Sequence, residues 1–431
     1  MVLRVSDIRR FLYFLLAVCI GNDVFYFMHT GNTYLNVSLL ISVVLLILNI
    51  QCDGNAFIVA LRRTHKSIKV YFLFIIMSCL VAVLNFGGSG LRSFIMGLID
   101  LFLSFTVFLN VMMVDERFSE PFYKGLYIGF IANIFMSLIQ YLLFKSGNSF
   151  SWYNYFPNPA FQRNIYWYRA QGFFLETSHF LSYLSCVIPI VLISMKKSKK
   201  NILLLVCSIM ILAYLLLAVG LPAGSAALLF ISLFFSIATY FWSFEKRISV
   251  SRKKIFFALF IIGLLMVVAI VSLERIDFSK VSRILSDSLQ TASLSDADNV
   301  IRSSCMTECL RAAVKNPLGI GYNTTALYIN NFLSLKVSTA FNYTIQMFLE
   351  LGYMGGVSYL VMIGCLGFRN LKDSIKYHNK KKLVVFVAVM MAFLCQFSLG
   401  RFYLPYISMV YALGNAELYS SCNTGVYHKK P

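Results

Sequence analysis

The sequence predicts an all-α protein that crosses a membrane about twelve times and carries one long, partly helical loop on the external side. Three observations support this. Of the 431 residues, 59% are hydrophobic and only 13% are charged, whereas soluble domains carry about 25% charged residues. Apolar runs long enough for a span, which takes roughly 20 residues, recur along the chain. The charges gather in short clusters between these runs.

The predicted spans are apolar stretches bounded by polar or basic clusters. They cover residues 11–29, 34–50, 68–86, 94–114, 121–144, 172–195, 201–220, 222–243, 255–273, 341–368, 383–400 and 402–418. Gln51 to Asn55 interrupts the second run, so segment 34–61 is either a span followed by a surface helix or one long broken helix. No small-residue cleavage site follows the first run, which we interpret as an anchored helix.

These spans predict a single integral membrane domain. Residues 1–273 would hold the first nine helices, 274–340 the external loop, and 341–431 the last three helices and a cytoplasmic tail. The loop is the one long polar segment, and we expect it to close over a polar site at one membrane face. Its seven basic residues nearly balance its six acids.

The distribution of basic residues predicts the orientation. If the amino terminus is cytoplasmic and the spans alternate, the inside segments hold 26 Lys and Arg and the outside segments hold 12. Cytoplasmic loops carry an excess of basic residues, so both termini are expected inside and the long loop outside. The net charge of +20 follows this topological pattern, and we expect no nucleic-acid partner.

The sequence indicates no metal site and no cofactor. Most of the ten Cys lie inside spans, where they are small apolar fillers. Cys305 and Cys309 share the loop, but a spacing of four on a helix is poor disulfide geometry. Cys and His lack metal-ligand spacing, and a phosphate-binding loop is missing. Asp296-Ala-Asp298 matches a metal-binding pattern of some sugar-transfer enzymes, but so short a pattern often arises by chance.

Acidic residues within the spans indicate a polar cavity. Asp23, Asp100, Glu176 and Glu350 lie in or beside apolar helices, each toward the external half. A charge at mid-membrane costs about 2.5–3.5 kcal/mol, so such residues usually face a cavity or a partner. Four in the same half predict a cavity open to the outside. The alternative is snorkelling at span ends.

The segment Arg169–Phe180 is the first candidate for chemistry. On a helix, Glu176 and His179 share one face, and Arg169 lies just before them at the interface. A carboxylate near an imidazole and a guanidinium is a plausible general-base arrangement. A structural ion pair at the helix entry is the alternative.

A second set of cations lies on external segments. Residues 302–315 predict a helix that ends before Asn316-Pro317, with Arg302 and Arg311 on opposite faces. Guanidinium groups bind phosphate oxygens without a metal; a solvated amphipathic helix is the alternative. The glycines after Pro317 predict a tight loop near the membrane. Arg401, between the last two spans, either anchors headgroups or reaches the cavity.

These residues resemble the O-antigen and capsule polymerase family of bacterial envelopes (Wzy type), related to the O-antigen ligases. The resemblance rests on four ordered motifs: RAQGFFLETSHFLSYL at 169–184, with Thr177 for the usual Pro; GLPAGSAALLFISL at 220–233; Arg302 with RAAVKNPLGIGY at 311–322; and Phe341-Asn342 followed by Glu350, Gly352 and Gly355. Each motif is weak alone, but the ordered set within twelve spans is more specific.

The resemblance implies a membrane glycosyltransferase with a GT-C-like fold in the bacterial inner membrane. Such an enzyme transfers glycan from polyprenyl (undecaprenyl) pyrophosphate to the next lipid-linked repeat unit of O-antigen, capsule or exopolysaccharide. By this analogy Glu176 is the base and Arg302 assists catalysis. The resemblance also implies substrate-binding roles for five residues: Arg169, His179, Arg311, Asn342 and Arg401. A chain-length regulator and a flippase would be partners.

Two other functions remain open. Ligases of this superfamily tend to carry a His near the end of the external loop, but residues 274–340 contain none, which favours a polymerase. A lipid-linked oligosaccharide flippase or transporter would also have about twelve spans with internal polar residues. We find no repeat between the two halves, and transport would not explain the long loop. A transporter needs its charges near the bilayer centre, and an external transferase needs them at the outer boundary.

Overall fold

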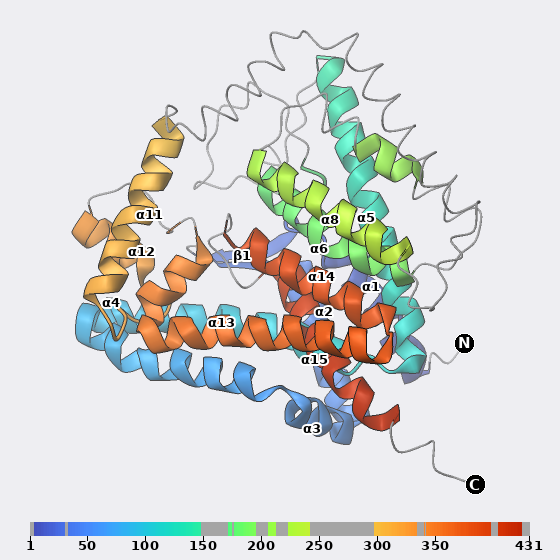
Figure 1. Ribbon diagram of the computed structural model, residues 1–431, viewed down its shortest axis with the longest axis horizontal. Helices are drawn as coiled ribbons and strands as arrows, with labels where there is room; N and C mark the ends of the chain where they lie inside the picture. The colour runs from blue at the N-terminus through green and yellow to red at the C-terminus, as the bar shows by residue number, and fades with distance from the viewer. Residues whose placement is uncertain are drawn as a thin grey trace.

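The computed structural model describes residues 4–30, 33–147, 171–174, 176–194, 206–212, 223–241, 297–333, 340, 342–397 and 404–424. Long helices run beside one another over most of this part of the chain (Figure 1). Their bounds are α1 (Val5–Cys19), α2 (Val37–Cys52), α3 (Gly54–Arg63), α4 (Lys66–Met112), α5 (Glu116–Lys145), α6 (Thr177–Ser194), α8 (Ala223–Phe241), α11 (Ala297–Lys315), α12 (Thr325–Tyr328), α13 (Tyr343–Tyr377), α14 (Lys380–Cys395) and α15 (Pro405–Thr424).

Helix α4 contains two of the predicted spans. Its backbone leaves the helical region at Gly87, with φ of 57°. The rings of Phe72 and Phe105 lie 5.1 Å apart, whereas a straight helix would separate them by about 50 Å. The helix therefore folds back at Gly87 into two arms, and the predicted boundary between spans 68–86 and 94–114 is confirmed. Large apolar side chains such as Leu84 and Phe102 are exposed on these arms, as expected for surfaces in contact with lipid.

The described helices confirm a polytopic membrane protein but not twelve spans. Four of them, α4, α5, α6 and α13, are long and apolar enough to cross a bilayer. The count rises to five if α2 and α3 form one broken span, since they meet at 113°. The break falls at Asp53, where the polar interruption predicted it, and the Asp53 carboxylate caps α3 by accepting from the amide of Ala56 at 3.0 Å. The predicted span 255–273 lies outside the described residues.

The first predicted span is too long, and the all-α prediction has one exception. Helix α1 ends at Cys19, and the chain then forms an antiparallel hairpin of β1 (Tyr26–Thr30) and β2 (Thr33–Asn36). Tyr, Phe and Thr favour strands, and Gly31-Asn32 between them is a dipeptide typical of hairpins. These local preferences outweigh the apolar run that suggested a helix up to residue 29.

Small residues bring α1 and α5 together. The Cα of Gly125 on α5 lies against the carbonyl of Phe14 on α1, and the Cα of Gly129 lies against the backbone of Val18. Without a hydrophobic force between helices in lipid, close backbone approach at small residues is a main source of association. This contact fixes α5 beside the first helix.

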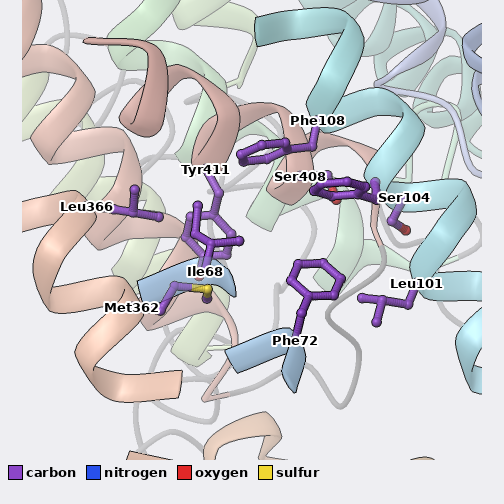
Figure 2. A pocket seen from close by; sticks show the side chains of 10 residues that line it. Ile68, Phe72, Leu101, Ser104, Phe108, Met362, Leu366, Ser408 and Tyr411 are labelled. Carbon is purple, nitrogen blue, oxygen red and sulfur yellow. The ribbon is translucent and has the colours of Figure 1, made fainter. Parts of the chain in front are cut away.

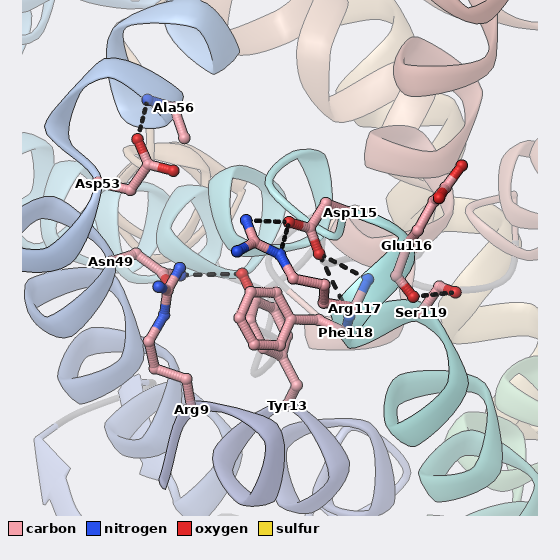
Figure 3. Close-up of polar contacts among 10 residues, drawn as sticks. All are labelled: Arg9, Tyr13, Asn49, Asp53, Ala56, Asp115, Glu116, Arg117, Phe118 and Ser119. Atoms are coloured by element: carbon pink, nitrogen blue, oxygen red, sulfur yellow. Dashed lines mark hydrogen bonds and ion pairs between the residues drawn. The ribbon is translucent and has the colours of Figure 1, made fainter. Parts of the chain in front are cut away.

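The short segments predicted to be cytoplasmic meet at one end of the molecule where the structure describes them; segments 196–200 and 245–254 lie outside the described residues. At this end Asn49 accepts from Arg9 and donates to Tyr13, each at 2.9 Å (Figure 3). Asn49 also donates to Asn110 at 2.9 Å. The next segment joins them through His65, whose amide donates to Asn415 at 2.9 Å and whose ring lies 3.4 Å from the guanidinium of Arg369.

Helices α13, α14 and α15 are also joined at this end. The ammonium group of the buried Lys382 lies 3.2 Å from the carboxylate of Asp373 and donates to the carbonyl of Glu417. Segments 62–69, 369–382 and the end of α15 are therefore neighbours, as the alternating topology requires.

An apolar pocket lies between the two arms of α4, α13 and α15 (Figure 2). Nearly all of its lining is apolar, and the polar groups in it are hydroxyls. The lining residues are Ile68, Phe72, Leu101, Ser104, Phe105, Phe108, Met362, Leu366, Ser408 and Tyr411. No Asp, Glu, His, Lys or Arg lines this pocket.

The α1–α5 contact predicts a specific sensitivity to one added methyl group. Gly125→Ala places a Cβ against the Phe14 carbonyl and 3.0 Å from the Cβ of Ala17, and such overpacking costs about 1–3 kcal/mol. We expect a lower melting temperature in detergent, measured by fluorescence-detected size exclusion after heating. Gly54→Ala is the matched control, because a Cβ there meets nothing within 4 Å. Equal melting temperatures for the two variants would contradict the packing argument.

Candidate functional site

The segment that precedes α6 is held on α5 by two side-chain amides. Gln140 both donates to the carbonyl of Gly172 and accepts from its amide, each at 3.2 Å. The Oδ1 of Asn133 accepts from the amide of Phe173 at 2.9 Å. Gly172 has φ of +56°, and a Cβ there would lie 2.7 Å from that Oδ1. A glycine is therefore required at this position of the RAQGFFLETSH motif.

The same asparagine brings in the segment that follows α1. Asn133 donates through Nδ2 to the carbonyl of Gly21 at 2.8 Å. The amide of Asp23 donates to the carbonyl of Phe173 at 2.9 Å. The chain leaving α1 and the chain entering α6 thus lie side by side on α5, which brings Asp23 to the first turn of α6.

Asp23, His179 and Glu176 form a row of ionisable groups at this point. The Nδ1 of His179 lies 3.0 Å from Oδ2 of Asp23, and its Nε2 lies 4.0 Å from Oε2 of Glu176. Asp23 and His179 are buried, whereas the Glu176 side chain is 32% exposed. The hydroxyl of Ser178 donates to the same Glu176 oxygen at 2.9 Å.

This order of groups suits proton abstraction by Glu176. An ionised carboxylate only accepts hydrogen bonds, so Nδ1 of His179 donates to Asp23 and leaves Nε2 facing Glu176. Asp23 thus fixes the orientation of the imidazole, and both the imidazole and the Ser178 hydroxyl lie beside the Glu176 carboxylate. The exposed end of the row is the Glu176 carboxylate, which is the position a general base needs.

A second carboxylate, Glu350 on α13, is buried and fully partnered. It accepts from the amide of Asn323 at 2.9 Å, from Nε2 of Gln346 at 2.9 Å, and from Thr325 through both hydroxyl and amide, at 2.7 and 3.4 Å. A buried carboxylate without such donors would be costly. Two of its three partners belong to the loop after α11, so Glu350 holds that loop against α13.

The loop and α13 cross at a point where each of the two segments has a glycine. The amides of Ile320 and Gly321 donate to the carbonyls of Leu349 and Glu350, each at 2.9 Å. Gly319 and Gly352 have φ of +84° and +70°, and a Cβ on either would collide with the backbone of the other segment. The predicted tight loop after Pro317 is confirmed, and its glycines permit this crossing.

The crossing also binds both arms of α4. The amide of Tyr322 donates to the hydroxyl of Ser78 at 3.1 Å, and Nδ2 of Asn323 donates to the carbonyl of Ser93 at 2.8 Å. The end of α11 is held as well, because the Tyr353 hydroxyl donates to the Val314 carbonyl at 2.9 Å. The described part of the long loop is therefore docked on the helices.

Helix α11 begins at Ala297, earlier than the predicted start at Arg302, and ends where the sequence indicated. It stops at Lys315, before Asn316-Pro317. Its buried face carries Cys305 and Cys309 and packs against the first turns of α13. The two thiols lie 4.0 Å apart and are hydrogen-bonded, and they form no disulfide. The hydrogen bond between the two thiols lowers the pKa of Cys305 and raises the pKa of Cys309.

The predicted substrate-binding residues are distributed as follows. Arg311 lies on the exposed face of α11, paired with Glu308. Asn342 caps α13 by accepting from the amide of Ile345 at 3.1 Å. The side chains of Arg169, Arg302 and Arg401 lie outside the described residues. His179 joins Glu176 as predicted, but its pairing with Asp23 was missed. Their common position in the external half was the signal that could have suggested it.

The fold and this site define a class: a polytopic helical membrane protein with ionisable groups at the entry of a span and a loop helix docked above the spans. Residues 207–360 match the model of a family described as O-antigen ligase. Over these residues, which make up about a third of the chain, the protein is similar to O-antigen ligases.

The matched segment contains α11, Glu350 and the glycine crossing, whereas Asp23, Glu176 and His179 precede it. No curated protein matches the chain. In the described part of the chain, no group of three or more His, Cys, Asp or Glu side chains is arranged to hold a metal ion.

The Glu350 contacts predict that its replacement frees the loop. In Glu350→Gln the amide nitrogen faces donors that need an acceptor, and a buried unsatisfied donor costs about 1–3 kcal/mol. We expect faster amide hydrogen exchange at residues 317–325, measured by mass spectrometry on the purified protein. Glu308→Gln is the matched control, because its carboxylate pairs at the surface with Arg311. Unchanged exchange in Glu350→Gln would show that the carboxylate does not hold the loop.

Proposed function

We propose that this protein is a polymerase of lipid-linked oligosaccharide repeat units at the external membrane face. The observation that carries the proposal is the row of Asp23, His179 and Glu176 at the entry of α6, with its exposed end at Glu176. This position is at a span boundary rather than mid-span, which favours a transferase over a transporter. The family match supports a substrate of lipid-linked polysaccharide.

The proposed reaction is a glycosyl transfer without a nucleotide. A sugar hydroxyl of the acceptor repeat unit attacks the anomeric carbon of the donor glycan, and Glu176 takes the hydroxyl proton. The new glycosidic bond forms as the bond from the anomeric carbon to pyrophosphate breaks. The polyprenyl pyrophosphate leaves with the electron pair. General-base catalysis of this kind contributes about 10²–10⁴-fold.

Arginines would stabilise the leaving pyrophosphate. In the sequence, Arg169 shortly precedes Gly172 and Arg401 shortly precedes Leu404. The described residues after them converge, since the rings of Phe174 and Tyr406 lie 6.3 Å apart. At about 100° per residue, position 302 falls on the same side of α11 as Cys305 and Cys309, the side that packs against α13. Planar guanidinium groups suit this role because they bind phosphate oxygens in a fork.

The two candidate regions adjoin each other through α14. The thiol of Cys395 contacts the carbonyl of Ser182 on α6 at 4.0 Å. The next residue, Gln396, accepts from the amide of Tyr343 at 2.9 Å. The entry of α6 and the start of α13 are thus neighbours at the same end, which supports one site formed by Glu176 and the docked loop.

We infer twelve spans in a GT-C-like arrangement in the bacterial inner membrane, with both termini cytoplasmic. The gathering of segments 62–69 and 369–382 at one end supports this topology, as does the position of the loop beside the opposite tip of α4. The undecaprenyl carrier, the capsule or O-antigen product, and partnership with a flippase and a chain-length regulator follow from the family resemblance.

A ligase is the second candidate, because the matching family model is described as O-antigen ligase. A ligase would transfer a finished glycan to a terminal acceptor instead of the next repeat unit. The same base and pyrophosphate chemistry would serve both reactions, so the product distinguishes them.

The product of a gene deletion tests this choice. A polymerase deletion is expected to leave single repeat units on the acceptor, seen as one band in place of a ladder on a polysaccharide gel. Complementation with the wild-type gene should restore the ladder. Loss of every repeat from the acceptor would favour the ligase, and an unchanged ladder would refute both assignments.

The base assignment predicts a graded loss of activity. Glu176→Gln removes the proton acceptor and should lower the transfer rate by about 10²–10⁴-fold. Asp23→Asn keeps the size of the side chain but weakens the hold on His179, so a smaller loss is expected. The rates are measured with purified protein and lipid-linked repeat units. The control is Glu116→Gln, an exposed carboxylate at the other end of the molecule. Full activity of Glu176→Gln would exclude this residue as the base.

A further inference from the structure

Helix α13 carries an exposed stripe that changes from apolar to basic along its length. Met354, Val357, Val361 and Phe368 are exposed apolar side chains on this stripe. Arg369, Lys372 and Lys376 follow them, also exposed. The helix from Gly352 to its end is about 37 Å long, and the hydrocarbon core is about 30 Å thick. The basic residues therefore fall where acyl chains give way to headgroups.

A groove lies at this transition. It is open and lined by residues of both kinds: Gly364, Cys365, Phe368, Arg369, Lys372, Asp373 and Lys376. The hollow exists because Gly364 has no side chain, and a Cβ there would meet only a ring carbon of Phe368, at 3.9 Å. The groove thus has an apolar floor below a cationic rim.

The cations of the rim are not neutralised by the protein. Asp373 is the acid in the groove, and its carboxylate is already paired with Lys382 at 3.2 Å. Glu417 nearby is paired with Lys381 at 2.7 Å. Among the described residues, no ion pair joins Arg369, Lys372 or Lys376 to a carboxylate. Arg369 instead lies beside His65, whose pKa is lowered by burial and by the charges of Arg369 and Lys66.

The neighbouring segment adds positive charge of its own. The contact between His65 and Arg369 brings the end of α3 and the start of α4 to the groove, with Arg62, Arg63, Lys66 and Lys69. Juxtamembrane clusters of this size attract anionic lipids, and basic pockets on the cytoplasmic side bind their headgroups.

We propose that this groove binds an anionic phospholipid of the cytoplasmic leaflet, with its phosphate between Arg369, Lys372 and Lys376 and one acyl chain over Gly364 and Phe368. A lipid fits better than free phosphate because the apolar floor leads directly into the bilayer. The site is separate from the proposed catalytic residues and does not depend on the reaction that they perform.

The test compares lipid retention by the full-length protein. Wild-type protein is reconstituted in nanodiscs of phosphatidylcholine with a minority of phosphatidylglycerol, and the lipids that stay bound are counted by native mass spectrometry. Wild type should retain phosphatidylglycerol in preference. The triple variant R369Q/K372Q/K376Q should bind it about tenfold more weakly, because each basic group near the surface contributes separately. The control is R92Q/K145Q/K315Q, which removes three exposed cations elsewhere and should retain the lipid.

Two further measurements separate the components of the site. Gly364→Leu fills the hollow without changing charge and should lower retention of phosphatidylglycerol. Inorganic phosphate alone should not raise the melting temperature of the protein in detergent, whereas phosphatidylglycerol should. Retention by the triple variant equal to that of wild type, or stabilisation by phosphate as large as by lipid, would overturn the proposal. Unchanged retention in Gly364→Leu would overturn the acyl-chain contact.

Discussion

The burial of the Glu350 carboxylate is the constraint on which the position of the loop between α11 and α13 depends. A charge enclosed by helices must be surrounded by donors, and here the donors come from Asn323, Thr325 and Gln346. Meeting this requirement draws the loop across α13, where Gly319 and Gly352 allow the two backbones to touch. The loop in turn contacts both arms of α4. One buried carboxylate thereby fixes the position of α11, the helix that carries Arg302 and Arg311.

The contacts of Glu350 and the row of Asp23, His179 and Glu176 differ in how much of their hydrogen-bonding capacity is used within the protein. The Glu350 contacts use all of their donors within the protein, so they position the loop and leave little for a substrate. The row that ends at Glu176 is different, because its last carboxylate is 32% exposed and is backed by buried partners. A carboxylate that has buried neighbours on one side and is exposed on the other is suited to chemistry on a bound molecule. The family match covers the first set and not the second, so the base assignment rests on geometry.

The positions of Asn133 and Gln140 explain how Glu176 reaches its place. Both lie on α5, which is anchored to α1 by the close contacts of Gly125 and Gly129. Each amide then binds backbone atoms of the segment before α6. At the opposite end of the bundle, Asp373 and Glu417 pair with lysines, and no carboxylate of the described residues forms an ion pair with the exposed cations of α13.

The sequence by itself determined the membrane class and several helix boundaries, and it pointed to Glu176 and His179 as candidate site residues. Hydropathy and charge clusters are local properties, so they located the break at Asp53, the reversal near Gly87 and the end of α11 at Lys315. They misjudged residues 26–29, where strand preference and apolar character compete. Only the tertiary structure decided the partners. Asp23 and His179 lie far apart in the chain and meet because Asn133 binds both segments, and Glu350 looked like one of four similar acids. Such pairings depend on long-range packing, which spacing along the chain does not encode.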